Sequence, residues 1–266
     1  MKGRAGAMVV VEVETGNIVA ANGFELAAHR LERPGSTVKP FVLMELLESG
    51  KMKAKHRLQC RRPLWIGGVR MDCAHPASVL DLDAEEAIAY SCNSYFAEGA
   101  TRLDAGELVQ VFKRAGFDSP SGLATDETTG HIEVPREVSR LQLEALGDRG
   151  IEVTPLELLA AYRRLAMRVR DGSLEEIDKP VFEGLEGSIE YGMAHAANVP
   201  GMKIAGKTGT AASNEGAKTH GFFAGFAPAE KPEIAIVVFI GSGTGGDAAE
   251  AARPILTAYA EGRRVQ

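Results

Sequence analysis

Ser36 and Lys39 stand three residues apart in the stretch "RPGSTVKPF", directly after a Pro-Gly pair. In a helix this spacing places both side chains on one face. A serine hydroxyl is a weak nucleophile until a base removes its proton, and a lysine amine can be that base when burial lowers its pKa. The pattern also fits a helix N-cap followed by a solvated cation, and Ser-x-x-Lys should occur about once by chance in a chain of this length.

A second polar pair, Ser91 and Asn93, lies in "YSCNSYF" at the end of a helical pattern. A second hydroxyl could relay a proton between a base and a leaving amine, and an amide could bind a peptide carbonyl. The alternative interpretation is a polar helix cap. The pair alone is close to a chance-level pattern.

The third pattern is "AGKTGTAAS", which contains Lys207, Thr208, Gly209 and Thr210. Its alternation predicts a strand, and glycines within it leave room for a ligand backbone to lie along the strand. Lys207 would supply a cation, and the two threonine hydroxyls could hold a carboxylate. A phosphate-binding P-loop is excluded, because Lys-Thr precedes the glycine and no Gly-x-x-x-x-Gly-Lys opens a helix. Lys-Thr-Gly is expected by chance only about 0.1 times here.

Strand patterns lie at both ends of the chain and helical patterns lie between them. Residues 7–23 predict two strands joined by a turn at Thr15-Gly16-Asn17, and three further strands are predicted in 201–213, 219–228 and 233–243. Helices are expected over about 36–47, within 82–167, in 183–199 and in 245–262, the last interrupted or kinked near Pro254. We therefore predict one domain, 1–266, with a sheet subdomain of about 1–50 and 200–266 and a helical lobe of about 80–198.

The overall charge is mildly acidic, with a formal net charge of −6. This argues against a nucleic-acid partner or an anionic membrane surface. No run of about 18 apolar residues could span a membrane. The first residues lack an apolar segment long enough for a signal peptide, so either the chain is cytosolic or its export segment lies upstream.

The chain contains three cysteines, Cys60, Cys73 and Cys92, and the sequence allows more than one chemical role for them. Cys60 and Cys73 flank a predicted hairpin around Gly67-Gly68 and could face each other. A disulfide between them would stabilise the fold by roughly 3 kcal/mol in the chain-entropy model. They could instead be free thiols in a reducing compartment, or zinc ligands with His75, although no second CxxC-type pair accompanies them.

The order Ser-x-x-Lys, Ser-x-Asn, Lys-Thr-Gly is the signature of penicillin-binding proteins and serine β-lactamases. The chain resembles the transpeptidase domain of penicillin-binding proteins, also in "VTPLELLAAYRRLA" and "GFFAGFAPAEKPEIAIVVFI", from about residue 9 to 255. The resemblance implies an α+β fold of the β-lactamase/transpeptidase type, in which a five-stranded antiparallel sheet is flanked by helices and joined to an all-helical lobe.

The resemblance also implies a role for each matching residue. Ser36 would attack the D-Ala-D-Ala carbonyl of a peptidoglycan stem peptide and expel D-Ala, with Lys39 as general base. Ser91 and Asn93 match the residues that relay a proton and position the substrate.

The third motif would bind the substrate's charged end. Lys207 and Thr208 match residues that bind it electrostatically, and Thr210 matches the hydroxyl that holds its carboxylate or that of a β-lactam, with Gly209 between them. The backbone N–H groups of Ser36 and Thr210 would form the oxyanion hole. No metal and no organic cofactor are expected.

Several activities share this signature. The acyl-enzyme could pass to an amine, as in a transpeptidase, or to water, as in a carboxypeptidase. A β-lactamase is disfavoured, because no asparagine has a glutamate four residues before it and Asn93 stands where class D enzymes carry an apolar residue. A non-catalytic β-lactam sensor or scaffold is the remaining alternative. The implied location is extracytoplasmic, with anchoring and any contacts to other cell-wall proteins supplied by upstream modules.

Overall fold

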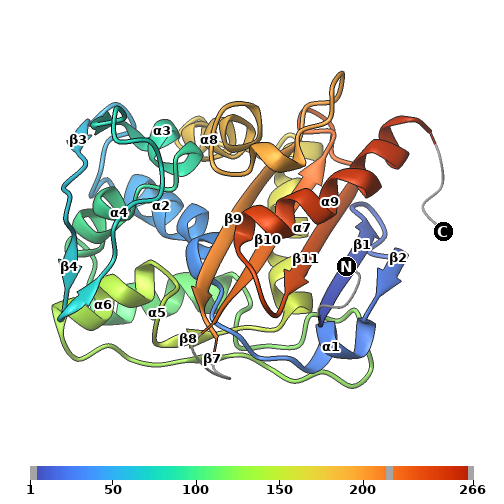
Figure 1. Cartoon of the computed structure of the whole chain (residues 1–266), viewed down its shortest axis with the longest axis horizontal. Helices are drawn as coiled ribbons and strands as arrows, with labels where there is room; N and C mark the ends of the chain where they lie inside the picture. Colours follow the sequence, from blue (N-terminus) through green and yellow to red (C-terminus); the bar gives the residue numbers. More distant parts are fainter. Residues whose placement is uncertain (1–4, 214–217, 263–266) are drawn as a thin grey trace.

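The structure is a computed structural model that describes residues 5–213 and 218–262. Figure 1 shows a sheet with helices on both faces and a group of helices beside one edge. The sheet is antiparallel, in the order β2-β1-β11-β10-β9. Its strands are β1 (Gly6–Glu12), β2 (Ile18–Asn22), β9 (Ala205–Ala212), β10 (Thr219–Ala227) and β11 (Ile234–Ile240). The predicted five-stranded sheet and the α+β class are therefore confirmed.

Alternating side chains of the central strands enter two separate cores. In β11, Val237 and Phe239 pack on one face, whereas Ile236 and Val238 pack on the other. Successive side chains of a strand point to opposite faces of the sheet. A strand whose residues are all apolar therefore needs a packing partner on each face. Helix α9 (Gly245–Ala260) covers one face and α7 (Pro155–Arg170) the other (Figure 1).

The two covering helices begin at strong caps. Thr154 and Glu157 form a capping box with Pro155 in the first turn of α7, and Thr244 caps α9 in the same way. Helix α9 continues through Pro254 without the interruption that the sequence suggested. Helix α1 (Phe24–His29) follows β2.

Most of the remaining helices lie on the β9 side of the sheet, as Figure 1 shows, whereas η2 packs against α9 and α8. The remaining helices are η1 (Gly35–Val38), α2 (Lys39–Glu48), α3 (Ala84–Ala89), α4 (Asn93–Ala100), α5 (Ala105–Arg114), α6 (Val138–Ala145), α8 (Lys179–Glu190) and η2 (His195–Ala197). Three short strand pairs join them: β3 (Leu58–Gln59) with β6 (Asp81–Leu82), β4 (Trp65–Ile66) with β5 (Val69–Arg70), and β7 (His131–Ile132) with β8 (Ile151–Glu152). The division into a sheet subdomain and a helical lobe stays a prediction.

Two predicted helices have different bounds in the structure. The helix expected over 36–47 begins as a 3-10 turn, η1, and becomes α-helical only at Lys39. The helix expected in 183–199 ends at Glu190, because the chain turns at Gly192. A Cβ at Gly192 would lie 2.2 Å from the carbonyl oxygen of Ala89, so no side chain fits there.

No helix within the described ranges is both long and apolar enough to cross a lipid bilayer.

Candidate active site

The turn that carries Ser36 is held tightly against β9. Gly35 has a φ of 56°, and a Cβ there would lie 2.8 Å from the backbone nitrogen of Thr210. The Gly35 N–H donates to the carbonyl oxygen of Gly147 at 2.9 Å. Only glycine permits both this backbone conformation and this approach. The Pro-Gly pair before Ser36 therefore brings the first motif against the third.

A buried tyrosine fixes the same turn from the other side. Tyr162 on α7 is fully buried, and its hydroxyl donates to the carbonyl oxygen of Thr37 at 2.9 Å. The Thr37 hydroxyl donates to the carbonyl oxygen of Pro34 at 2.8 Å. These two bonds tie the backbone of the turn to a side chain within it and to α7. Ser36 therefore sits on a rigid support.

Lys39 begins α2 and is completely buried. Its Nζ donates to the Ser91 carbonyl oxygen at 2.9 Å and to Asn93 Oδ1 at 2.6 Å, and it lies 3.4 Å from Ser91 Oγ. The ring centroid of Phe96 is 5.2 Å from Nζ. Burial lowers the pKa of Lys39 to about 8, which makes the neutral amine accessible near neutral pH. This amine links the first motif to the second.

Ser91 has a φ of 54° and is the one non-glycine residue with a positive φ in the described part of the chain. It follows the last turn of α3, and the next amide, that of Cys92, donates back to the Ala87 carbonyl at 3.0 Å. This backbone conformation aims the Ser91 carbonyl at Lys39 Nζ. Residues held in such strained conformations cluster at functional sites, where the surroundings enforce them.

The amide of Asn93 is bonded at both ends. Oδ1 accepts from Lys39, and Nδ2 donates to the Met71 carbonyl oxygen at 3.0 Å. The Asn93 backbone N–H donates to Cys73 Sγ at 3.1 Å. Cys73 belongs to a buried group of three cysteines and His75 that could hold a metal ion. In this structure Asn93 positions Lys39, and its contact with a substrate stays a prediction.

The third motif lies on β9, the edge strand nearest the turn that carries Ser36. Lys207 is fully buried, and its Nζ donates to the Thr208 carbonyl oxygen at 3.2 Å. Burial lowers the pKa of Lys207 well below its usual value, and the charge of Lys39 lowers it further. Thr210 is exposed, and its Oγ1 accepts from the Gly245 N–H at 2.8 Å.

Gly209 makes room for the protein's own backbone. A Cβ at Gly209 would lie 2.2 Å from the Pro34 carbonyl oxygen, so any side chain would push the turn that carries Ser36 away from β9. This glycine is thus needed for the two motifs to meet.

The structure brings all eight predicted site residues into one region, but it leaves one expected bond unmade. Ser36 is half-buried, and within residues 5–213 and 218–262 no partner hydrogen-bonds to its Oγ. Lys39 bonds the second motif instead. Hydrogen bonds of catalytic groups are often long or absent until a substrate binds, so this geometry does not exclude Lys39 as the base.

Sequence reasoning missed several residues that hold the site. Tyr162 occupies one position in an ordinary amphipathic helix pattern, so nothing local marks its bond to the turn. His220 on β10 is fully buried and its Nε2 lies 2.7 Å from the Arg33 carbonyl oxygen, which precedes the turn. Neither partner is near in sequence, and no spacing rule would have found them.

Comparisons with known proteins identify one protein family. The sequence model of the family described as "Penicillin binding protein transpeptidase domain" matches residues 6–259. Peptidoglycan D,D-transpeptidase FtsI of Escherichia coli K12 is 27% identical over 280 residues, which cover 90% of this chain and 47% of that protein. Stage V sporulation protein D of Bacillus subtilis 168 is 26% identical over 246 residues, which cover 78% of this chain and 38% of that protein.

A solved structure shows the same fold. The crystal structure of the D,D-transpeptidase domain of a peptidoglycan glycosyltransferase from Eggerthella lenta superposes with a TM-score of 0.83 and 21% sequence identity. The match covers 98% of this chain and 78% of that one. This chain spans less than half the length of the two curated relatives.

Proposed function

Because the chain belongs to the penicillin-binding protein transpeptidase domain family, we propose that it is a serine D,D-transpeptidase. It forms an acyl-enzyme on Ser36 with the D-Ala-D-Ala end of a peptidoglycan stem peptide and passes the acyl group to an amine. β-Lactam antibiotics acylate the same serine. The observation that carries this proposal is the buried Lys39, which shares hydrogen bonds with the second motif while its own turn packs on the third.

The chemistry follows from the protons that these groups can hold. Neutral Lys39 accepts the Ser36 proton as the hydroxyl attacks the peptide carbonyl. This requires Nζ to exchange one of its present bonds to Ser91 or Asn93 for a bond to Ser36 Oγ. Ser91 then passes a proton to the departing D-Ala amine. An incoming amine repeats the steps in reverse and releases the cross-linked product.

The backbone nitrogens of Ser36 and Thr210 are proposed to bind the oxyanion. The close approach of Gly35 to Thr210 supports this, because it places the two N–H groups on adjoining segments. Loss of one such donor typically costs about 3 kcal/mol of transition-state stabilisation. A preformed pair of backbone donors needs no reorganisation when charge develops.

The substrate's terminal carboxylate is proposed to bind at Thr210. The Thr210 hydroxyl oxygen already accepts a hydrogen bond from Gly245, so its proton remains free to donate to a carboxylate. Thr208 and Lys207 lie two and three residues before it, and a bound carboxylate would favour the protonated form of the buried Lys207, whose pKa burial lowers. Gly209 keeps this segment against the nucleophile turn.

The substrate determines where the domain must work. Peptidoglycan is cross-linked outside the cytoplasmic membrane, so we place this domain there, tethered by a segment upstream of residue 1. Contacts with other cell-wall proteins would come from further modules of the same polypeptide.

Intact-mass measurement after incubation with a fluorescent penicillin tests the nucleophile. Wild type is expected to gain one penicilloyl group, and Ser36→Ala none. Ser49→Ala, an exposed position at the other end of α2, is the matched control and should be acylated like wild type. Acylation of Ser36→Ala would refute the assignment, and an adduct lost within seconds would favour a β-lactamase.

Release of D-Ala from a stem-peptide mimic, with and without an added amine acceptor, then tests the reaction. Product that contains the acceptor supports transpeptidation. D-Ala release without cross-linked product would indicate a carboxypeptidase, and a stable penicilloyl adduct without any D-Ala release would indicate a sensor.

A further inference from the structure

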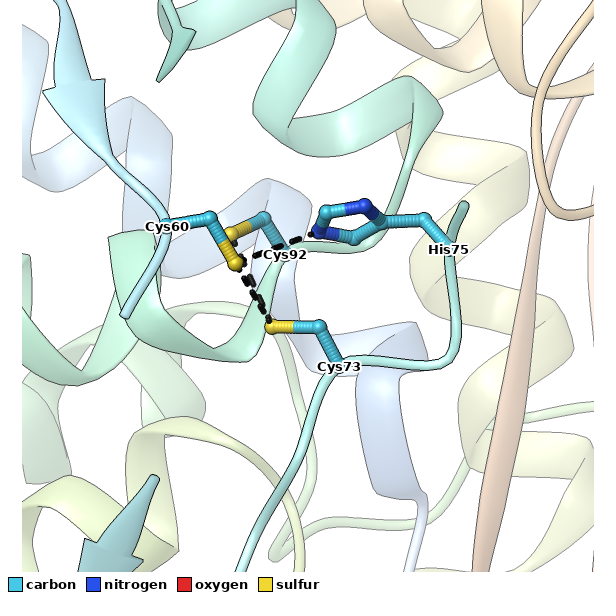
Figure 2. A group of neighbouring side chains, drawn as sticks. All are labelled: Cys60, Cys73, His75 and Cys92. Carbon is cyan, nitrogen blue, oxygen red and sulfur yellow. Dashed lines mark hydrogen bonds between the residues drawn. The ribbon is translucent and has the colours of Figure 1, made fainter. Parts of the chain in front are cut away.

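Three cysteines and one histidine converge directly behind the second motif. Cys60 follows β3, Cys73 and His75 follow β5, and Cys92 is the residue between Ser91 and Asn93. Figure 2 shows the three sulfur atoms and the imidazole ring turned toward a common centre. All four residues are buried, and their ligand atoms lie within 4.8 Å of one another. We propose that this group binds one structural zinc ion.

The three distances that join neighbouring ligand atoms fit the edges of a tetrahedral site. Cys60 Sγ lies 3.5 Å from Cys73 Sγ and 3.6 Å from His75 Nε2, and Cys73 Sγ lies 3.7 Å from Cys92 Sγ. A tetrahedron with Zn–S bonds of about 2.3 Å and a Zn–N bond of about 2.05 Å has S···S edges of about 3.8 Å and S···N edges of about 3.6 Å. These three edges match the tetrahedron to within about 0.3 Å, and every remaining pair of ligand atoms lies within 4.8 Å.

A disulfide explains the arrangement less well. The three cysteines are free, and 3.5 Å between Cys60 Sγ and Cys73 Sγ is far beyond a covalent S–S length of about 2.05 Å. Cys73 Sγ is almost equally close to Cys92, so no one pair is selected. A disulfide would also give no reason for His75 Nε2 to lie 3.6 Å from Cys60 Sγ. Zinc uses all four residues.

Neighbouring groups suit zinc-bound thiolates and a zinc-bound imidazole. The Asn93 N–H donates to Cys73 Sγ, and His75 Nδ1 lies 3.1 Å from the Pro76 carbonyl oxygen. When Nδ1 carries the proton and donates it to this carbonyl, Nε2 is left with the lone pair that a metal needs. Arg62 Nη2 also lies 2.7 Å from Nδ1 and 3.2 Å from Nε2, so on zinc binding it must leave both ring nitrogens and keep its 2.9 Å bond to the His75 carbonyl.

Charge and proton balance favour a divalent ion at this position. Binding converts three thiols to thiolates and releases three protons, with no change of oxidation state. Three thiolates, a neutral imidazole and Zn²⁺ carry a net charge of −1, and the Arg62 guanidinium beside His75 compensates for it. Soft sulfur ligands select zinc over magnesium or calcium, and a four-ligand set leaves no open position for a substrate.

The ion would fix the second motif through Cys92. The ion would link the segment 60–75 to Cys92. The residues on either side of Cys92, Ser91 and Asn93, bind Lys39. From the sequence, Cys60, Cys73 and His75 were possible zinc ligands, but no metal was expected, because no second CxxC-type pair accompanies them. The proposal concerns metal content and is therefore independent of the proposed transpeptidase activity.

Metal content of the purified protein tests the site. We expect one zinc per chain by elemental analysis and three free thiols after denaturation. Cobalt substitution should give the thiolate charge-transfer and intense visible bands of tetrahedral cobalt. His75→Asn should weaken zinc binding by more than the roughly 10–100-fold that loss of an outer partner costs, whereas His131→Asn, an exposed control, should not. Absence of zinc after reconstitution under reducing conditions, or a Cys60–Cys73 disulfide, would overturn the proposal.

Chelation of the wild-type protein tests the positioning role without a variant. Removal of zinc should lower the melting temperature and slow the penicillin acylation step, with initial penicillin binding little changed, and added zinc should restore both. If zinc is present but its removal leaves the acylation step unchanged, the link to Lys39 is wrong. If Ser36 proves not to be acylated at all, the metal measurements still decide the site.

Discussion

Ser91 offers the sharpest test of how the second motif works, because its backbone and its hydroxyl have separate roles. The left-handed backbone, with φ of 54°, aims the carbonyl at Lys39, and the hydroxyl lies 3.4 Å from the same amine. Ser91→Ala removes the hydroxyl and keeps a Cβ. Ser91→Gly removes the hydroxyl and also relieves the strain. Both variants keep the carbonyl bond to Lys39.

The stability difference between the two variants can be estimated from the backbone alone. A left-handed conformation costs a residue with a Cβ roughly 1–2 kcal/mol, which glycine does not pay. Glycine also has more conformational freedom in the unfolded chain, which lowers the stability of the folded glycine variant by roughly 0.5–1 kcal/mol. From the middle of these two ranges, Ser91→Gly should be more stable than Ser91→Ala by roughly 0.75 kcal/mol, which corresponds to about 1.5–3 °C in melting temperature for a domain of this size.

Thermal unfolding of four variants, with Ala or Gly at position 91 and Ala or Gly at position 49, tests this prediction. Ser49, with φ of −76°, is the matched control, because there Ala should be the more stable replacement. Both Ser91 variants should also lose most of the penicillin acylation rate, if the hydroxyl relays the proton. If Ala is as stable as Gly at position 91, the strain argument is wrong, and if acylation survives in both, so is the relay.

Three further predictions concern other groups at the site. Because protonated Lys39 cannot act as a base and its pKa is about 8, acylation should rise about tenfold per pH unit below about pH 8 and level off above it, and a flat profile from about pH 6 to 9 would contradict this role. Tyr162→Phe leaves the Thr37 carbonyl unsatisfied and should cost about 1–3 kcal/mol in urea unfolding, against under about 0.5 kcal/mol for the half-exposed Tyr191→Phe. His220→Gln keeps a donor near the position of Nε2 and should retain more acylation than His220→Leu, and equal rates would show that this bond does not position the nucleophile turn.

Local patterns were sufficient to predict the sheet and the helices that carry the motifs. The alternation in β1 and β2 and the apolar run of β11 have the spacing that a strand requires, and the capping residues of α7 mark its first turn. The motif residues are recognisable because each set is close together in the sequence.

What the sequence could not show are contacts between segments far apart in the chain. The bond between Tyr162 and Thr37 and the approach of Gly209 to Pro34 depend on the packed fold. Cys92 was not counted with the other possible metal ligands, since no ligand spacing in the sequence links it to Cys60, Cys73 and His75. The 3-10 turn at Gly35 reflects tertiary contact with β9, which helical periodicity does not record.

The pairing of β1 with β11 sets an order on the assembly of this protein during synthesis. The first strand, beginning at Gly6, has its neighbour among residues 234–240, so the sheet cannot close until nearly the whole chain has been made. Ser36 is made early, but β9, the strand against which its turn packs, comes more than 160 residues later. Pairing over such a separation is slow, because loop closure precedes any stabilising contact. A chain interrupted before residue 205 would therefore carry the nucleophile without the strand that completes its site.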